Sequence, residues 1–311
     1  MIPAMTTLPP PDALVILGPT AAGKTSLGVR LANALHGEII SADSRQVYRG
    51  LDIGSGKDLG EYMVDGETIP HHLIDIVDVD HEFSVFEFQQ RCFEAIENIT
   101  SRGKLPIIVG GTGLYLEAVL KGYKMVEVPE NTDLRNTLRI QTDDELEARL
   151  LSLRPNQHNQ TDLQNRNRLY RAIEIAEYTQ IHPPEPLPDL HPLILGTRWS
   201  RSDLHARIAH RLKERMNHGL IEEVTALREQ GVSDARLYNL GLEYRYVTDL
   251  LTGEINNKND LFQKLLPAIK NLAKRQETWF RRMERNGMEI HWIDEANVEE
   301  ALAVAQKALN R

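Results

Sequence analysis

The sequence predicts an α/β protein in which a parallel β-sheet is flanked by helices and a helical segment is inserted near the middle of the chain. Short β-branched runs alternate with longer helical patterns in the first third, which is typical of a parallel sheet with crossover helices. A glycine-rich loop follows the first run. A stretch without strand patterns, ending in a proline cluster, separates these elements from the final ones.

Length and composition indicate a folded chain of two lobes. The 311 residues can bury a substantial core, and 41% apolar and 26% charged residues are ordinary for a globular protein. No apolar run approaches the roughly 20 residues that span a bilayer, and a signal peptide is not evident. We therefore expect a cytoplasmic protein that does not associate with a membrane. The single cysteine, Cys92, is expected to be buried and inert.

The first part of the chain supplies most of the sheet. Its expected elements are strand 13–17, helix 24–35, strand 38–41, strand 72–77, helix 84–102, strand 105–109 and helix 114–120. Ser84 followed three residues later by Glu87 is a capping-box pattern, which predicts where the second of these helices begins.

From about residue 121 the pattern becomes helical, and it closes in the proline cluster 182–192. We therefore expect an α-helical insertion domain over 123–192 and a core built from 1–122 and 193–311. The elements expected after the insertion are strand 193–197, helices 203–218, 220–230 and 261–285, and a last strand over 289–293.

The glycine-rich loop fits the phosphate-binding pattern G-x-x-x-x-G-K-[ST] in full, after a strand and at the start of a helix. Backbone N–H groups at a helix N-terminus attract anions, a lysine neutralises outer oxygens, and the Thr25 hydroxyl can bind Mg²⁺. The core is therefore expected to be P-loop NTPase-like. The predicted anion-binding residues are Gly18, Thr20, Ala21, Ala22, Gly23, Lys24 and Thr25.

Asp43 is the carboxylate best placed to act with this loop. An ordinary ATPase would add an acidic residue after a second apolar strand, but strand 105–109 runs into Gly110 and Gly111. Asp43 follows strand 38–41, at the edge where open α/β sheets bind ligands. Two interpretations stay open: a cap for a local turn or helix, or a general base or metal ligand facing the loop.

The charge distribution limits the possible partners. A net charge of −9 argues against indiscriminate nucleic-acid binding, although a local basic groove is compatible with it. Residues 264–285 hold seven Lys or Arg against two Glu, and residues 198–215 hold six against two acids. Taken alone, such runs are typical of a solvated helix face.

Six segments together resemble the tRNA dimethylallyltransferases, or IPP transferase family, in order and spacing over nearly the whole chain. The segments are GPTAAGKT, GEIISADSRQVYRGLDIG, PHHLIDIVD, FSVFEFQ, LPIIVGGTGLYLEAVL and AKRQETWFRR. The Asp-Ser-Arg-Gln run at 43–46 and the VGGTGLY turn are far more discriminating than the phosphate loop, which many unrelated enzymes share.

The resemblance implies transfer of a dimethylallyl group from dimethylallyl diphosphate to the N6 amine of the adenosine just 3′ of the tRNA anticodon. The loop would then bind a diphosphate leaving group, with no ATP consumed. Asp43 would accept the amine proton, and Thr25 with Mg²⁺ would stabilise the departing diphosphate. An arginine of the helix over 203–218 would assist, either Arg207 or Arg211.

The resemblance also implies contacts with the tRNA anticodon stem-loop. Ser44, Arg45 and Gln46 would contact the edge of the extruded adenine. Arg168 and Arg171, three residues apart on one helical face, would contact the stem-loop. The expected clamps on the RNA backbone are Lys274, Arg275, Arg281 and Arg282. Trp279 and Phe280 are expected to be core anchors.

The chain departs from the family pattern at several points. The segment GLEYR, 241–245, carries Glu243 where the family usually has the second glycine of Gly-Ile-Gly-Tyr-Lys, and IGSGKD stands in place of Ile-Gly-Thr-Ala-Lys-Pro. The insertion is shortened before Asn165, and there is no cysteine pair for an appended zinc finger.

Three other functions stay open. An adenylate isopentenyltransferase performs the same chemistry on a free nucleotide, but the insertion argues against it. An ATP-dependent small-molecule kinase would suit the phosphate loop equally well. A catalytically inactive RNA-binding paralogue would bind tRNA without turnover.

Overall fold

The computed structural model describes residues 10–155 and 165–309. The chain forms two compact units: the sheet unit, which contains the residues up to 121 and from 189 onward, and the helical unit, residues 122–188. The second boundary lies a few residues before the expected one. Residues 189–191 belong to the sheet unit because the Asp12 carboxylate accepts the His191 N–H at 3.0 Å and Leu190 packs on its core.

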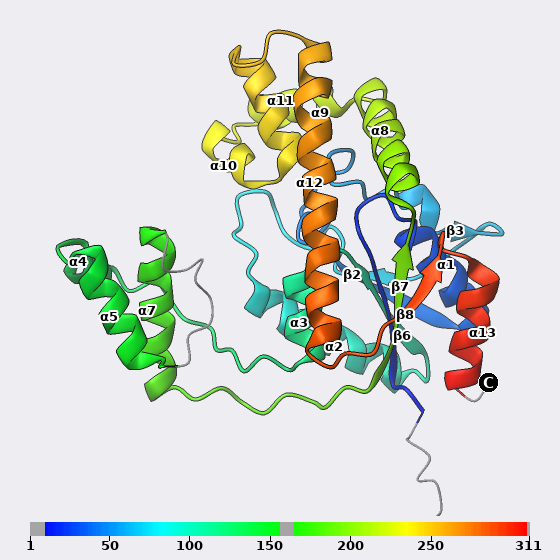
Figure 1. Cartoon of the computed structure of the whole chain (residues 1–311), viewed down its shortest axis with the longest axis horizontal. Coiled ribbons are helices and arrows are strands. Elements are labelled where there is room, and N and C mark those ends of the chain that lie inside the picture. Colours follow the sequence, from blue (N-terminus) through cyan, green and yellow to red (C-terminus); the bar gives the residue numbers. More distant parts are fainter. Residues whose placement is uncertain (1–9, 156–164, 310–311) are drawn as a thin grey trace, which may run out of the picture. The chain divides into compact units, whose positions relative to one another are not determined.

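The sheet unit is built on a six-stranded sheet in the order β5-β2-β6-β1-β7-β8, with neighbouring strands parallel (Figure 1). Leu17 is in register with both Gly110 and Gly196, and Ala42 is also in register with Gly110, so three strands end together. The strands are β1 (Ala13–Leu17), β2 (Gly37–Ala42), β5 (His71–His72), β6 (Leu105–Gly110), β7 (Pro192–Arg198) and β8 (His291–Asp294).

Different helices cover the two faces of the sheet because successive strand residues point to opposite sides. Leu14 and Ile16 pack with α1 (Lys24–Leu35) and α13 (Val298–Ala308). Val15 and Leu17 pack in the cluster that holds α2 (Val85–Ser101), α3 (Gly113–Leu120) and the end of α12 (Lys258–Arg285). The α/β class, with a parallel sheet between helices, is confirmed.

A second group of helices in the sheet unit packs around its own apolar cluster, which also takes in Val47 and Leu51 from the segment after β2. Figure 1 shows this group beyond the ends of β7 and β8. Its helices therefore stand over the strand ends, where the phosphate loop lies. They are α8 (Arg201–Asn217), α9 (Leu220–Glu229), α10 (Asp234–Asn239), α11 (Leu242–Thr252) and most of α12.

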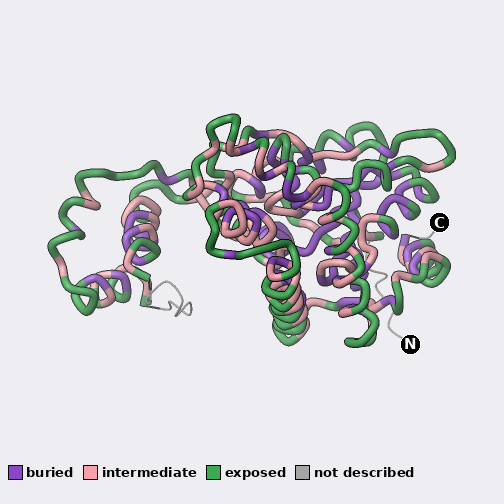
Figure 2. Tube along the Cα trace, turned by 90° about the horizontal axis from the view of Figure 1, so that it is seen from above, coloured by how far each residue is buried: buried purple, intermediate pink, exposed green. Residues whose placement is uncertain are grey.

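The helical unit contains α4 (Thr132–Arg139), α5 (Asp143–Leu153) and α7 (Arg166–Ile181). Leu138, Leu146 and Ile173 are fully buried in its own cluster, so the unit has a small core of its own. Figure 2 shows that buried residues occur in the interior of both units and that exposed residues follow the outer sides of the helices.

The strand predicted over 72–77 is wrong beyond His72. Leu73 and Asp75 adopt left-handed conformations with φ of 62° and 54°, which end the strand. The N–H groups of Asp75 and Ile76 instead donate to the carbonyls of Gln46 and Val47, at 3.1 and 2.8 Å. The apolar spacing of this segment thus reflects burial against the core and not membership of the sheet.

The capping box predicted at Ser84 is half correct. The Ser84 hydroxyl accepts the Glu87 N–H at 3.1 Å and caps α2 as expected. The Glu87 carboxylate contacts His81 and Arg91, at 2.7 and 2.9 Å, and does not accept the Ser84 N–H as a full capping box requires. Cys92 on this helix is fully buried, and burial raises the pKa of its thiol to about 12, which confirms its predicted burial.

No helix in residues 10–155 and 165–309 is long and apolar enough to cross a membrane.

Glu38, at the start of β2, supports a prediction about stability. Its side chain is 1% exposed, and its carboxylate meets Arg102, His72 and Lys104. Hydrogen bonds from Arg102, outweighing the cost of burial, lower the pKa of Glu38 to about 2. A lowered folded-state pKa adds stability above the unfolded value and loses it as the pH falls toward 2.

Glu38→Gln is therefore expected to lower the free energy of unfolding by about 2 to 3 kcal/mol at pH 7. The difference in free energy of unfolding between the variant and the wild type should narrow as the pH falls from 5 to 3. Urea denaturation at each pH measures this difference. A gap that stayed constant over this range would contradict the assignment of the stabilisation to the ionised carboxylate.

Candidate active site

The phosphate loop joins β1 to α1 and turns sharply before the helix. Ala21 and Gly23 both adopt left-handed conformations, with φ of 63° and 81°. Within the described part of the chain, no side chain caps α1 at Gly23. The first N–H groups of the helix are thus left for an anion, as the loop pattern predicts.

Gln276 on α12 ties this loop to the turn after β6. Its Oε1 accepts the Thr20 N–H at 2.8 Å, and its Nε2 donates to the Gly111 carbonyl at 2.9 Å. The helix also approaches the turn closely, because a Cβ on Gly113 would lie 2.5 Å from the Trp279 ring. Gln276 was not among the predicted site residues, although it stands among the basic residues of the AKRQETWFRR segment.

Lys24 lies in the loop with its charge only partly compensated. Its Nζ donates to the Pro19 carbonyl at 2.7 Å. Burial, and then the nearby Arg211 guanidinium, lower the pKa of Lys24 to about 8, while Asp43 and Glu61 act in the opposite direction. An anion bound in the loop would restore the favourable surroundings of the ammonium group.

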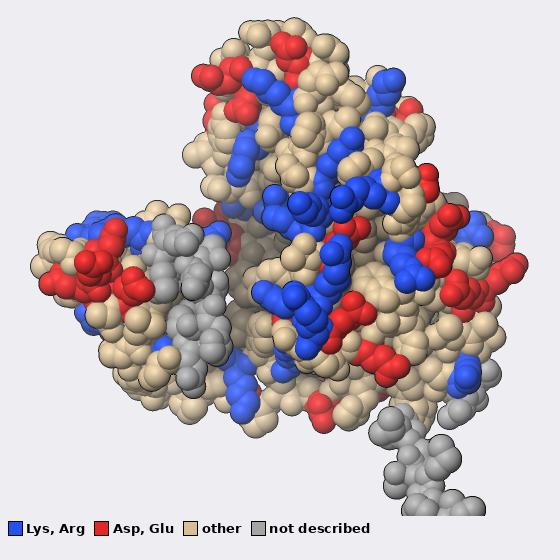
Figure 3. All heavy atoms as spheres, in the orientation of Figure 1, with Lys and Arg blue, Asp and Glu red and all other residues tan. Residues whose placement is uncertain are grey.

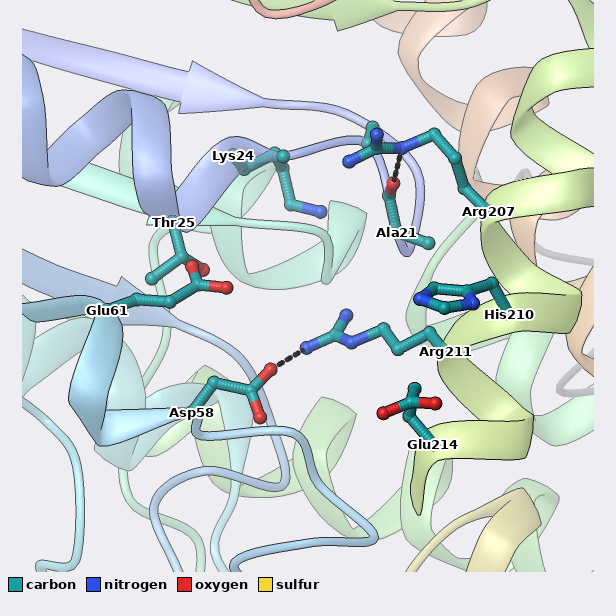
Figure 4. A pocket seen from close by; sticks show the side chains of 11 residues that line it. Ala21, Lys24, Thr25, Asp58, Glu61, Arg207, His210, Arg211 and Glu214 are labelled. Atoms are coloured by element: carbon teal, nitrogen blue, oxygen red, sulfur yellow. Dashed lines mark hydrogen bonds and ion pairs between the residues drawn. The ribbon is translucent and has the colours of Figure 1, made fainter. Parts of the chain in front are cut away.

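The outer cavity, of about 340 Å³, opens beside the loop (Figure 4). Residues 21–25 form one wall, and Asp58 and Glu61 form another, at the 3₁₀ turn η1 (Leu59–Tyr62). Burial, and then Asp58, raise the pKa of Glu61. The third wall is α8, which contributes Arg207, His210, Arg211 and Glu214.

The two candidate arginines both reach this cavity. Arg207 donates through Nε to the Ala21 carbonyl at 2.8 Å, and its guanidinium lies 4.2 Å from the centre of the Trp199 ring. Arg211 pairs with Asp58 and donates to the Gly56 carbonyl at 3.2 Å. The sequence did not separate them, and the structure places both at the phosphate loop.

The inner cavity, of about 120 Å³, brings Asp43 and the phosphate loop together. Thr20, Lys24 and Thr25 line it on the loop side, and Arg211 lines it as well as the outer cavity. Its further lining residues are Gln46, Gly54, Ser55, Gly56, Tyr62, Val109, Gly110, Gly111, Arg215, Glu243, Leu272 and Gln276.

Both interpretations of Asp43 are compatible with its contacts. Its Oδ1 accepts the N–H groups of Arg45 and Gln46, at 2.8 and 3.4 Å, and so caps the turn after β2. In the described part of the chain no hydrogen bond to Oδ2 occurs, and the side chain lines the inner cavity. The turn therefore fixes the carboxylate and leaves one oxygen available.

The residues after Asp43 differ in what they can contact. Gln46 is buried, and both ends of its amide are occupied: Oε1 accepts the Ser41 hydroxyl at 2.8 Å and Nε2 donates to the Gly56 carbonyl at 3.1 Å. The Ser44 N–H donates to Thr112 Oγ1 at 3.2 Å, while Arg45 is half-buried. Gln46 thus holds the cavity wall in place.

Lysines and arginines gather over α12 on one face of the sheet unit (Figure 3). Lys274 and Arg275 are exposed, and their side chains form no ion pair among the described residues. Phe280 on the same helix is fully buried, which confirms that it anchors the core. The helix therefore buries one side and presents cations on the other.

In the helical unit, the two candidate arginines have different surroundings. Arg168 is exposed, and within residues 165–188 and 122–155 its guanidinium has no partner. Arg171 pairs with the buried Glu174 at 3.1 Å and donates to the Val128 carbonyl at 2.7 Å. Arg171 thus has a structural role in joining α7 to the segment before α4.

The oxygen atoms beside the loop suit a hard divalent cation. Thr25, Asp58 and Glu61 all line the outer cavity, and Mg²⁺ prefers one or two such groups together with phosphate oxygens and water. Among the described residues, no cluster of three or more His, Cys, Asp or Glu side chains is arranged to hold a metal by itself.

A parallel sheet with a phosphate loop, and a carboxylate fixed in the same cavity, define an enzyme with a P-loop core that acts on a phosphorylated substrate. The model of the family described as IPP transferase matches residues 46–283. The chain therefore belongs to the IPP transferase family.

Relatives of known name agree with this assignment. The tRNA dimethylallyltransferase 1 of Geotalea uraniireducens is 59% identical over 284 residues, covering 91% of this chain and 92% of the relative. The tRNA dimethylallyltransferase 2 of Trichlorobacter lovleyi is 55% identical over 301 residues, covering 96% of both. The crystal structure of the tRNA isopentenylpyrophosphate transferase from Bacillus halodurans matches with a TM-score of 0.69 at 31% identity, covering 96% and 97% of the two chains.

Proposed function

We propose that this chain transfers a dimethylallyl group from dimethylallyl diphosphate to the N6 amine of the adenosine 3′-adjacent to the tRNA anticodon, releasing diphosphate. One observation carries the proposal: the phosphate loop and Asp43 line a single cavity, so that an anion and an acceptor amine can meet there. The printed names of the relatives describe the same activity in those proteins.

The donor's diphosphate is bound by the loop. Its N–H groups, Lys24 and the guanidinium groups of Arg207 and Arg211 surround the outer cavity and compensate the charge that grows as the C1–O bond breaks. Arg207 is held by the Ala21 carbonyl and by stacking on Trp199, so it is oriented before the donor arrives.

Asp43 acts as the general base. An adenine amine is a weak nucleophile because its lone pair is delocalised into the ring. The N6–C1 bond forms as diphosphate leaves, and the proton lost from the amine passes to the Asp43 carboxylate. Its Oδ1 is held by the turn, so the carboxylate keeps a fixed position during the transfer.

Mg²⁺ fits beside the loop, where the Thr25 hydroxyl and the carboxylates of Asp58 and Glu61 would hold it together with diphosphate oxygens. When bound, the cation withdraws charge from the leaving group.

The acceptor is the adenosine of a tRNA anticodon stem-loop, flipped out of its stack to reach the inner cavity. Ser44 and Arg45, which follow Asp43 in the chain, would contact the edge of the base. Lys274 and Arg275 on α12 contact the RNA backbone, and Arg168 of the helical unit contacts the stem-loop. Lys274, Arg275 and Arg168 are exposed and form no ion pair with any residue in 10–155 or 165–309, which supports this assignment.

Transfer can be tested by incubating the protein and Mg²⁺ with tRNA and carbon-labelled dimethylallyl diphosphate, followed by mass spectrometry of the nucleosides. Label in N6-modified adenosine supports the proposal. Label in free adenosine monophosphate but not in tRNA would indicate an adenylate isopentenyltransferase. Transfer of the γ-phosphate of ATP to a small molecule would indicate a kinase.

Arg168→Ala is expected to weaken tRNA binding and to reduce the slope of log Kd against log salt by about 1, because one phosphate contact is lost. Affinity for dimethylallyl diphosphate should not change. Filter binding of the tRNA at several salt concentrations measures its affinity and the salt slope. Arg168→Lys is the matched control and should keep the slope, while an unchanged slope in the alanine variant would remove Arg168 from the interface.

A further inference from the structure

Arg215 of α8 and Glu243 of α11 form an ion pair inside the inner cavity. The Arg215 Nη1 and Glu243 Oε1 atoms are 3.3 Å apart, and the two side chains are only 12% and 15% exposed. Arg207, Arg211 and Arg215 follow one another at intervals of four residues on α8, so the row of guanidinium groups leads from the phosphate loop to Glu243. The pair thus lines the same cavity as Asp43.

The pair has hydrogen-bonding capacity left over. A guanidinium has five N–H donors, and here Nη1 makes two long contacts, to Glu243 and, at 3.5 Å, to the Gly54 carbonyl. The Nε atom is buried and has no partner among the described residues. In the part of the chain that the structure describes, the Glu243 carboxylate meets Arg215 and its own backbone N–H, and no other side chain donates a hydrogen bond to it. Buried polar groups normally have partners, so a cavity-lining pair with open positions indicates a polar ligand group.

The parts of the two substrates can be assigned in turn. The diphosphate is bound at the loop with Arg207 and Arg211, and the five-carbon chain has no polar atom. Among the groups at the reacting centre, the remaining polar group is the edge of the acceptor purine, where an amine donor stands beside a ring-nitrogen acceptor. Gln46, one of the three residues expected to contact this edge, already uses both ends of its amide within the protein.

We propose that Arg215 and Glu243 select the acceptor base by binding the edge of the purine at its six position. Glu243 accepts the amine hydrogen that Asp43 does not take, and Arg215 donates to a neighbouring ring nitrogen. A purine with a carbonyl in place of the amine would place its oxygen against the carboxylates of Asp43 and Glu243. Such a base should therefore bind more weakly. This inference rests on the proposed transfer to an adenosine amine.

The experiment measures binding and not turnover. Anticodon stem-loop RNAs carrying adenosine, purine riboside or inosine at the acceptor position are titrated against the protein with pyrophosphate and Mg²⁺ present. The wild type should bind the adenosine RNA about tenfold or more tightly than the inosine RNA, with the purine riboside between them. Equal affinities for adenosine and inosine RNA would overturn the proposal without the need for any variant.

Glu243→Gln tests the role of the carboxylate directly. A glutamine amide can donate to the inosine carbonyl, so the preference for adenosine over inosine should fall severalfold or vanish, while pyrophosphate affinity stays close to wild type. Glu222→Gln, at an exposed position of α9, is the matched control and should keep the wild-type preference. An unchanged preference in Glu243→Gln would assign the pair a purely structural role.

The transfer assay and the binding assay together distinguish failure of this inference from failure of the proposed function. If labelled dimethylallyl groups never reach tRNA, the proposed function fails whatever the binding ratios are. If transfer occurs but Glu243→Gln discriminates as the wild type does, only the inference fails.

Discussion

Asp43→Asn is expected to reduce kcat for dimethylallyl transfer by about 10² to 10⁴-fold, the range that general-base catalysis supplies. An asparagine keeps the Oδ1 acceptor that the N–H of Arg45 requires, so the turn after β2 should survive. It cannot accept the amine proton. Affinities for pyrophosphate and for the stem-loop RNA should stay within a few-fold of wild type, because the anion site and the basic surface are unaltered. Single-turnover transfer with labelled donor measures the effect.

Asp12→Asn is the matched control for this variant. Asp12 also accepts a backbone N–H, from His191, but it stands at the start of β1, away from the strand ends that form the cavity. It should transfer at the wild-type rate. A wild-type rate in Asp43→Asn would show that another group removes the proton, and the mechanism would have to be rebuilt around it.

The fold could be predicted from local patterns wherever burial and backbone geometry agree. Strand 13–17 and helix 24–35 match the structure to the residue, because an apolar run buried on both faces and a glycine turn leave few alternatives. The segment 72–77 shows the opposite case, since its apolar residues are buried in a loop held by Gln46 and Val47. Helix α13 was missed although it covers a face of the sheet.

From residue spacing alone, the site could be predicted only where its residues are contiguous, whereas Arg207 and Arg211 followed from the family resemblance. The loop 18–25 and the run 43–46 carry a recognisable spacing and each follows a predicted parallel strand, so both were expected at the carboxyl edge of the sheet. Gln276, Glu61 and the pairing of Arg215 with Glu243 come from distant segments, and their meeting depends on how α8, α11 and α12 stand over the strand ends. The sequence marked Glu243 as a departure but did not indicate its partner.

Lys24→Met is expected to weaken binding of dimethylallyl diphosphate by about 10- to 100-fold, the value of one or two charged hydrogen bonds. The wild type should also show a pH dependence, because the pKa of Lys24 is lowered to about 8 in the free protein. The ammonium form predominates below that pH and binds the anion. Affinity should therefore fall as the pH rises above 8, by up to about tenfold for each pH unit.

The source of this pH dependence can be isolated with Lys24→Arg. An arginine side chain stays charged throughout the accessible range, so the variant should lack the decline above pH 8 even if its affinity at pH 7 is lower. The donor does not contribute, because its last phosphate ionisation is complete by that pH. Isothermal titration between pH 6.5 and 9.5 measures both proteins. The same decline in Lys24→Arg would show that a group other than Lys24 loses its proton. The lowered pKa of Lys24, caused by burial and Arg211, would then not explain the pH dependence.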